Sequence, residues 1–166
     1  MKSMEDLQDA FAGESQANRK YLAFAKKADS EGLPQIAKLF RAAAAAETVH
    51  ALAHLRAMDG VGTTKENLAG AMSGEEFEFT DMYPKFIEDA KADDNKRALM
   101  SFKNAMAVEQ VHFSLYNDAA KQVAEGNDLP ADKIYVCSIC GNTVLGEAPE
   151  KCPVCGVPAS KFDEIA

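Results

Sequence analysis

The sequence uses one short pattern twice, as Glu47-Thr-Val-His50 and as Glu109-Gln-Val-His112. Both copies lie in long stretches whose apolar residues recur with the period of a helix. A helix has about 3.6 residues per turn, so residues three apart share a face and each copy presents a carboxylate beside an imidazole. Two such pairs on separate helices, with further glutamates on two more, indicate a site for two metal ions.

Outward from these copies, the same periodicity predicts four amphipathic helices. The first two run over about 4–29 and 34–59, the third from a cap at Thr63 or Thr64 to a turn at 92–95, and the fourth from there to about Glu125. Gly32 suits the residue after a helix end, and Pro34 suits a first turn. Pro84 lies inside the third helix, where we expect a kink rather than a break. The fold class is therefore mainly α, a four-helix bundle.

The last part of the chain has a different composition. From Lys133 on it is rich in Val, Ile, Gly, Pro and Cys, and it holds both cysteine pairs, Cys137-Ser-Ile-Cys140-Gly and Cys152-Pro-Val-Cys155-Gly. Each Cys-x-x-Cys pair directs two thiolates at one metal, and the glycine that follows lets backbone N–H groups approach the sulfurs. Iron and zinc both accept four thiolates, and spacing alone does not choose between them. We predict a bundle domain over 1–129 and a small metal-bound β/loop domain over 130–166.

Charge and hydropathy exclude several classes of protein. The formal net charge is −8, which argues against nucleic acid or an anionic membrane surface as a partner. No stretch approaches the roughly 18 apolar residues of a membrane span, and the N-terminus lacks the apolar core of a signal peptide. We therefore expect a cytoplasmic protein, in which the cysteines bind metal rather than form disulfides.

Four glutamates fall among the apolar positions of their helices, one on each helix: Glu14, Glu47, Glu75 and Glu109. Burying an unpaired carboxylate is costly, so four of them call for a cation, although any single one could reach solvent from the edge of its stripe. Their separations of 33, 28 and 34 residues fit antiparallel helices. Four carboxylates balance two divalent ions, and a Glu from each of two helices with Glu-x-x-His from two others is the ligand pattern of ferritin-like di-iron proteins.

Other polar residues lie near this set. Glu78 is one turn beyond Glu75 and offers a fifth carboxylate, or else it lies beside the ligands or in solvent. Tyr21 and Tyr83 lie within a turn or two of a ligand and either hydrogen-bond the carboxylates or pack in the core. We expect His54 at the edge of the bundle rather than among the ligands.

Taken together, the chain resembles the rubrerythrins over nearly its whole length. The resemblance is carried by Phe11-Ala-Gly-Glu-Ser-Gln-Ala17, the two Glu-x-x-His pairs, Gly74-Glu75-x-x-Glu78-x-x-x-Met82-Tyr83-Pro84 and the two cysteine pairs. It implies a ferritin-like bundle followed by a rubredoxin-like domain. One departure is Ile134-Tyr135-Val136 before the first cysteine pair, where some relatives carry Trp.

The resemblance also implies a site and a reaction. Two non-haem irons, with oxo and carboxylate bridges, would be bound by Glu14, Glu47, His50, Glu75, Glu78, Glu109 and His112, with Tyr21 and Tyr83 nearby. Glu47 and Glu109 would bridge, and one iron would exchange Glu78 when oxidised for His50 when reduced. The four cysteines would hold one iron, or zinc in recombinant protein. The implied activity is reduction of hydrogen peroxide to water in oxidative-stress defence, with electrons from rubredoxin or an NAD(P)H:rubredoxin oxidoreductase.

The connector before the small domain bears on assembly. His112 lies 13 residues before the helix end, which is roughly 20 Å, and the connector 126–133 spans at most about 27 Å. We therefore expect the small domain to dock on a neighbour's bundle in a head-to-tail homodimer, as the resemblance also implies. The segment 60–74 leaves open whether the helices pack within one chain or swap between two.

Two rival functions stay open. One is a ferroxidase or other iron-handling ferritin-like protein with a structural zinc ribbon, and the other is a bundle whose metal only stabilises it. A built-in electron relay distinguishes the peroxidase from the first rival. A fifth carboxylate distinguishes it from the second.

Overall fold

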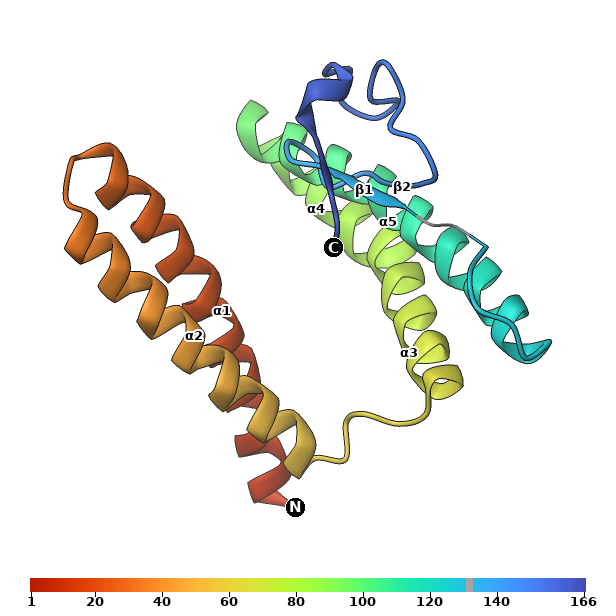
Figure 1. The fold of residues 1–166 in the computed structure, drawn as a ribbon, viewed down its shortest axis with the longest axis horizontal. Helices are drawn as coiled ribbons and strands as arrows, with labels where there is room; N and C mark the ends of the chain where they lie inside the picture. The colour runs from red at the N-terminus through yellow and green to blue at the C-terminus, as the bar shows by residue number, and fades with distance from the viewer. Residues whose placement is uncertain (131–132) are drawn as a thin grey trace. The chain divides into compact units, whose positions relative to one another are not determined.

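A computed structural model describes residues 1–130 and 133–166. In chain order the elements are α1 (Lys2–Ser30), α2 (Pro34–Ala57), α3 (Thr64–Phe77), the π-helical segment η1 (Glu78–Met82), α4 (Tyr83–Ala92), α5 (Lys96–Ala124), β1 (Ile134–Cys137), β2 (Thr143–Leu145), the 3-10 turn η2 (Ala159–Lys161) and β3 (Phe162–Glu164) (Figure 1). The chain forms two compact units, residues 1–62 and 63–166. The boundary predicted at 129/130 is a different division and stays a prediction. Residues 131–132, within the predicted connector, lie outside the described residues.

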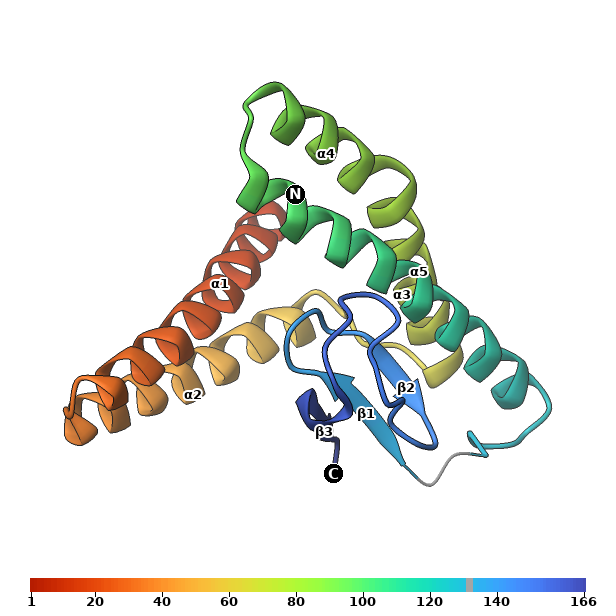
Figure 2. The ribbon, with the colours of Figure 1, turned by 90° about the horizontal axis from the view of Figure 1, so that it is seen from above.

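The first unit is a hairpin of α1 and α2, which lie side by side in both views (Figure 1, Figure 2). Gly32 makes the turn with a φ of +73°, a conformation open to glycine, and Pro34 begins α2, both as predicted. The buried core of the hairpin consists of Ala25, Ala28 and Ala37, with Phe40 packed against them. Small side chains let the two helices approach closely, but they bury little apolar area.

The second unit packs α5 against α3 and α4. Thr63 caps α3 through a reciprocal pair of hydrogen bonds with Glu66, which confirms the predicted start. Asn95 caps α5, and Gly126 follows its end with a φ of +80°. The predicted helices are thus confirmed to within about two residues at each end.

The predicted third helix continues through Pro84 by changing its winding. Residues Glu78–Met82 form a π-helical segment, and Pro84 then lies in the first turn of α4, where its missing N–H breaks no intrahelical bond. The helical run therefore does not break at Pro84, which agrees with the prediction. The π-helical winding itself was not predicted.

The small domain is a three-stranded antiparallel sheet in the order β2-β1-β3. Cys137 pairs with Phe162 across β1 and β3, and these two residues share a buried cluster with Cys152. Within the described residues, no helix combines the length and the apolarity needed to cross a bilayer.

Candidate metal centres

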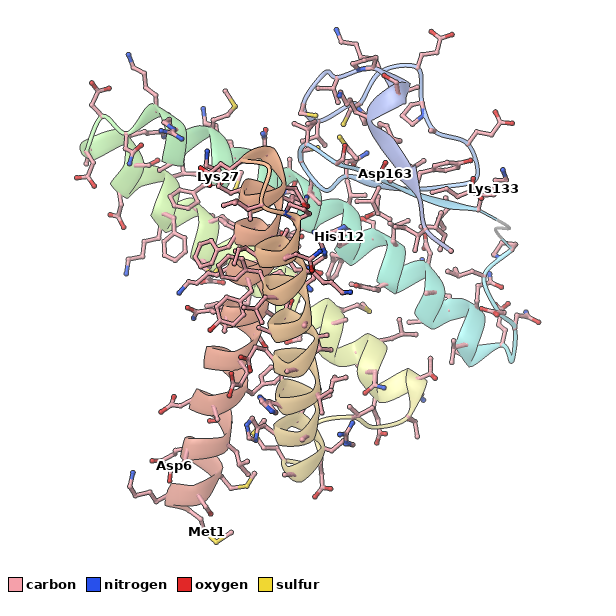
Figure 3. All side chains as sticks on the ribbon, turned by 60° about the vertical axis from the view of Figure 1, so that its left-hand side comes forward. Met1, Asp6, Lys27, His112, Lys133 and Asp163 are labelled. Atoms are coloured by element: carbon pink, nitrogen blue, oxygen red, sulfur yellow. The ribbon has the colours of Figure 1, made fainter. Side chains whose placement is uncertain are left out.

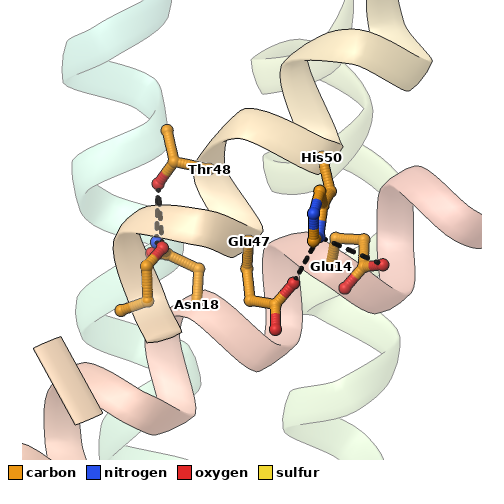
Figure 4. A network of polar contacts seen from close by, with 6 residues as sticks. Glu14, Asn18, Glu47, Thr48 and His50 are labelled. Carbon is orange, nitrogen blue, oxygen red and sulfur yellow. Dashed lines mark hydrogen bonds and ion pairs between the residues drawn. The ribbon is translucent and has the colours of Figure 1, made fainter. Parts of the chain in front are cut away.

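The first unit gathers one set of ligand atoms, which we call the first cluster: Glu14 from α1 with Glu47 and His50 from α2. One ligand atom from each residue lies within 4.8 Å of the others. His50 Nδ1 is 2.9 Å from Glu47 Oε2 and 4.0 Å from Glu14 Oε1, and the three side chains turn toward one another between the helices (Figure 4). The i,i+3 spacing and the hairpin pairing together build this cluster.

Asn18 fixes the two helices of the first cluster to each other. Its buried side-chain amide donates to the Ala44 carbonyl at 2.6 Å and to Thr48 Oγ1 at 2.8 Å (Figure 4). Asn18 lies one turn after Glu14, and Thr48 is adjacent to Glu47. Because buried polar contacts are specific in direction, this bridge sets the height of Glu14 relative to Glu47.

The second cluster lies in the second unit and consists of Glu75 from α3 with Glu109 and His112 from α5. Its ligand atoms also lie within 4.8 Å of one another. His112 Nδ1 is 2.8 Å from Glu109 Oε2 and 3.7 Å from Glu75 Oε1. Burial, and then repulsion from Glu109, raises the pKa of Glu75 to about 7, although His112 opposes the shift. Glu75 and Glu109 therefore repel each other within the cluster.

The donor set of each cluster fits a metal such as iron. Each cluster offers two carboxylates and one imidazole, ligands that suit iron and manganese as well as zinc. In both clusters Nδ1 is the ring nitrogen that faces the carboxylates, so it is the histidine atom placed to bind a metal. A cation would also offset the repulsion that raises the pKa of Glu75.

The four cysteines form a third centre. Cys137 Sγ lies 3.7 Å from Cys155 Sγ, and Cys140 Sγ lies 3.6 Å from Cys152 Sγ. A tetrahedron with metal–sulfur bonds of about 2.3 Å has sulfurs about 3.8 Å apart, whereas a disulfide holds them at about 2.05 Å. The spacing is that of a four-thiolate metal site, as predicted.

Backbone N–H groups near these sulfurs favour thiolates, although burial raises the pKa values of Cys140 and Cys155. Burial raises the pKa of the Cys152 thiol, but the N–H groups of Cys155 and Val154 outweigh it and bring that pKa down to about 7. Gly141 and Gly156, which follow the two pairs, have φ values of +87° and +77°. Glycine adopts such positive φ values without strain. These turns therefore fit the predicted role of each glycine, which is to let backbone N–H groups approach the sulfurs.

Comparison with known proteins bears on both parts of the chain. The family model described as Rubrerythrin matches residues 5–120, and the one described as Rubrerythrin, rubredoxin-like domain matches residues 135–163. The chain belongs to the rubrerythrin family. Rubrerythrins are di-iron proteins of oxidative-stress defence that carry a rubredoxin-like domain, and this rubrerythrin has both parts.

Individual relatives cover nearly the whole chain. Rubrerythrin-2 of Clostridium acetobutylicum is 35% identical, over 94% of this chain and 92% of its own. Nigerythrin of Nitratidesulfovibrio vulgaris is 37% identical, over 96% of this chain and 85% of its own. A solved structure of nigerythrin in a partially reduced state is 36% identical with a TM-score of 0.59, covering 98% of this chain and 86% of that one. The predicted family and its ferritin-like fold are thus confirmed.

The other predicted site residues are not members of the two carboxylate clusters. Glu78 is outside the second cluster, but burial and the charge of Glu109 raise its pKa, so it shares that electrostatic environment. Tyr83 packs on Phe102, and burial, followed by Glu78 and Glu109, raises its pKa. Tyr21 packs against Phe24 and Phe40, so its described contacts are aromatic. His54 belongs to neither cluster, as expected.

The small domain lies against α5 of its own chain. Thr143 Oγ1 in β2 is 2.9 Å from His112 Nε2 (both residues belong to the second unit; His112 is labelled in Figure 3). The expectation that the small domain would dock on a neighbour's bundle rather than fold back onto its own chain is therefore wrong. In the sequence-based prediction, only the connector 126–133 spans the distance from the end of α5 back to His112. Strand β1 spans part of that distance, and its residue Val136 pairs with Thr143. The homodimer itself stays a prediction.

Sequence reasoning missed two polar residues that position the clusters. Neither Asn18 nor Thr143 was assigned a role from the sequence. Their partners are 26 and 31 residues away, so no local pattern reveals either contact. For Asn18, the available signal was an amide one helical turn after Glu14, among the apolar positions of its helix. For Thr143 there was no such signal.

Proposed function

We propose that this rubrerythrin is a peroxidase that reduces hydrogen peroxide to water. The first and second clusters would together hold two irons, with Glu78 as an additional carboxylate, and the four cysteines would hold a third iron. Each ferrous ion of the pair would supply one electron, so that one hydrogen peroxide, two electrons and two protons would give two waters. The rest of the proposal concerns what the side chains do.

The contact between His112 and Thr143 carries this proposal. Thr143 Oγ1 also lies 3.2 Å from the carbonyl oxygen of Gly141, the residue after Cys140. A short chain of hydrogen bonds thus runs from the second cluster to the cysteine loop within one unit. An iron-storage protein with a structural zinc ribbon gains nothing from such a contact, which is why we favour the peroxidase.

The electron donor belongs to the same proposal. The sequence contains no Gly-x-Gly-x-x-Gly, the motif that cradles a dinucleotide in a Rossmann fold. We propose that rubredoxin, or an NAD(P)H:rubredoxin oxidoreductase, reduces the cysteine-bound iron. The carboxylate clusters would then be re-reduced through the Thr143 contact.

The test uses protein purified from its native source, because a four-thiolate site made in a foreign host takes up zinc readily. The cysteine-bound iron should absorb visible light, bleach with a chemical reductant and recover its colour when hydrogen peroxide is added. Stoichiometric loss of peroxide should accompany the recovery. Native protein that holds only zinc at the cysteines, or that leaves peroxide unconsumed, would favour the ferroxidase.

A further inference from the structure

The connection between the two units is short. Only residues 58–63 separate α2 from α3. Ferritin-like bundles contain one long crossover, which is needed when one helix ends at one end of the bundle and the next begins at the other. The other turns, residues 31–33 and 93–95, are shorter still. No connection between the helices of this chain is long enough to be that crossover.

Both ends of the connection are fixed by hydrogen bonds. Gly60 N–H donates to the Leu55 carbonyl at 2.9 Å, so the chain folds back over the end of α2. At the other end Thr63 and Glu66 form the capping box that begins α3. These bonds leave few residues of 58–63 free to extend between the two helices. Lengthening the connection by unwinding either helix end would break them.

The required distance follows from the metal ligands. If Glu47 and Glu75 bind one iron pair, they lie at the same height in the bundle. At about 1.5 Å per residue, α2 continues about 15 Å beyond Glu47, and α3 begins about 16 Å before Glu75. A ferritin-like crossover must therefore climb at least about 31 Å, whereas seven residue steps reach at most about 25 Å.

We infer that two copies of this chain exchange their α1–α2 hairpins, so that the first cluster of each copy completes the second cluster of the other. This inference rests on the proposed di-iron centre. The alanine-lined hairpin also leaves large apolar side chains uncovered, with Leu39 and Val49 65% and 63% exposed. A second copy supplies a cover of the right chemistry, because the second unit likewise exposes Phe77 and Met100.

A cis–trans comparison tests the exchange. In the trans heterodimer, one chain carries Glu47→Ala and His50→Ala and the other carries Glu109→Ala and His112→Ala. In the cis heterodimer, one chain carries all four substitutions and the other is wild type. Two affinity tags isolate each heterodimer from co-expressing cells, and carboxylate-bound iron is measured against the cysteine-bound iron as an internal count.

The exchange predicts half the wild-type carboxylate-bound iron in the trans heterodimer and almost none in the cis heterodimer. Chains that close on themselves give the reverse, which would overturn the inference. Wild-type protein that binds no iron in its carboxylate clusters would instead contradict the proposed function. The two failures are therefore distinguishable.

A lengthened connection in the same trans heterodimer provides a second measurement, which tests whether the short connection causes the exchange. About 20 Gly and Ser residues inserted between Gly60 and Val61 give a flexible segment that reaches the required distance. Each chain can then close on itself, so the trans heterodimer with this insertion in both chains should lose its carboxylate-bound iron. Iron retained at the level of the uninserted trans heterodimer would show that the short connection does not cause the exchange.

Discussion

His112 makes a contact with each of its ring nitrogens. Nδ1 faces Glu109 at 2.8 Å, while Nε2 lies 2.9 Å from Thr143 Oγ1. When Nδ1 binds a metal, the proton is on Nε2, which donates to the Thr143 hydroxyl; that hydroxyl in turn donates to the Gly141 carbonyl. Thr143 therefore fixes both the tautomer and the orientation of the imidazole.

Replacing Thr143 tests this role. Thr143→Val keeps the shape of the side chain but leaves His112 Nε2–H without its acceptor, and losing such a partner typically weakens metal binding about 10- to 100-fold. Competition between the reduced protein and an iron chelator measures the change. Thr143→Ser, which keeps the hydroxyl, should bind iron like the wild type. Equal affinities of the Val and Ser variants would mean that the contact does not position His112.

At the scale of an element, the π-helical segment Glu78–Met82 places Glu78 beside the second cluster. A π-helical turn holds an additional residue and often marks a functional position in a helix. Burial, and then repulsion from Glu109, raises the pKa of Glu78. A carboxylate in this position is available to a metal without belonging to the cluster of closest ligand atoms.

Glu78→Ala should lower peroxide turnover at least about tenfold while the protein keeps its iron, because the other carboxylates and both histidines stay in place. Stopped-flow oxidation of the reduced protein by hydrogen peroxide, together with iron analysis, measures both quantities. Glu76→Ala is the matched control, since Glu76 is exposed on the same helix. A rate equal to that of the control would place Glu78 outside the reaction.

The cap of α3 gives a prediction about stability. Thr63→Ala removes the hydroxyl half of the capping box, while the backbone N–H of residue 63 still donates to Glu66, and should cost about 1 kcal/mol, or about 2–4 °C in Tm for a chain of this size. The Thr63 N–H and hydroxyl lower the pKa of Glu66 from its ordinary value of 4.5, so this stabilisation is present above that pH and is lost as the pH falls.

Thermal melting at neutral pH and at about pH 3 checks both statements, because the difference between Thr63→Ala and wild type should shrink once Glu66 is protonated. Thr64→Ala, next to the cap and exposed, should leave the Tm nearly unchanged. A pH-independent difference would contradict the role of Glu66.

What could be predicted from the sequence depends on the range of each interaction. The Glu-x-x-His pairs, the cysteine pairs and the Thr63 cap are set by residues three apart, and all were identified. Asn18 and Thr143 act across 26 and 31 residues, and helical periodicity does not record such pairings. The π-helical winding at Glu78 was also missed. The helix presents nearly the same face to the core before and after this segment, so the apolar pattern did not reveal the change in winding.

The spacing of the four glutamates illustrates the same limit at the scale of the molecule. A separation of 28 residues between Glu47 and Glu75 fits antiparallel neighbours in one chain. The ferritin-like crossover is a property of the family's topology, and only the bounds of α2 and α3 show that residues 58–63 do not reach across it. The exchange of hairpins thus follows from fold and connection together.

In the proposed enzyme, exchange and the Thr143 contact would together determine which chain's cysteine domain reduces which iron pair. The cysteine domain lies against His112 of its own chain. In an exchanged dimer, each site would therefore combine Glu47 of one chain with His112 and the cysteines of the other. A Cys140→Ser chain should then regain peroxidase activity, at about half the wild-type rate, when paired with a Glu47→Ala chain. Paired with a His112→Ala chain, it should stay inactive, because the only complete carboxylate site adjoins the damaged cysteines.

Turnover of the two tag-purified heterodimers measures this directly. Activity in both would mean that the hairpins are not exchanged and that the cysteine domain serves the site on the other chain, as in a head-to-tail dimer. Activity only with the His112→Ala partner would mean that the hairpins are exchanged but the cysteine domain serves the other chain's second unit. Inactivity in both would mean that the hairpins are not exchanged and each relay serves its own chain. Activity only with the Glu47→Ala partner is expected from the contact of Thr143 with His112 and from a connection too short to cross the bundle.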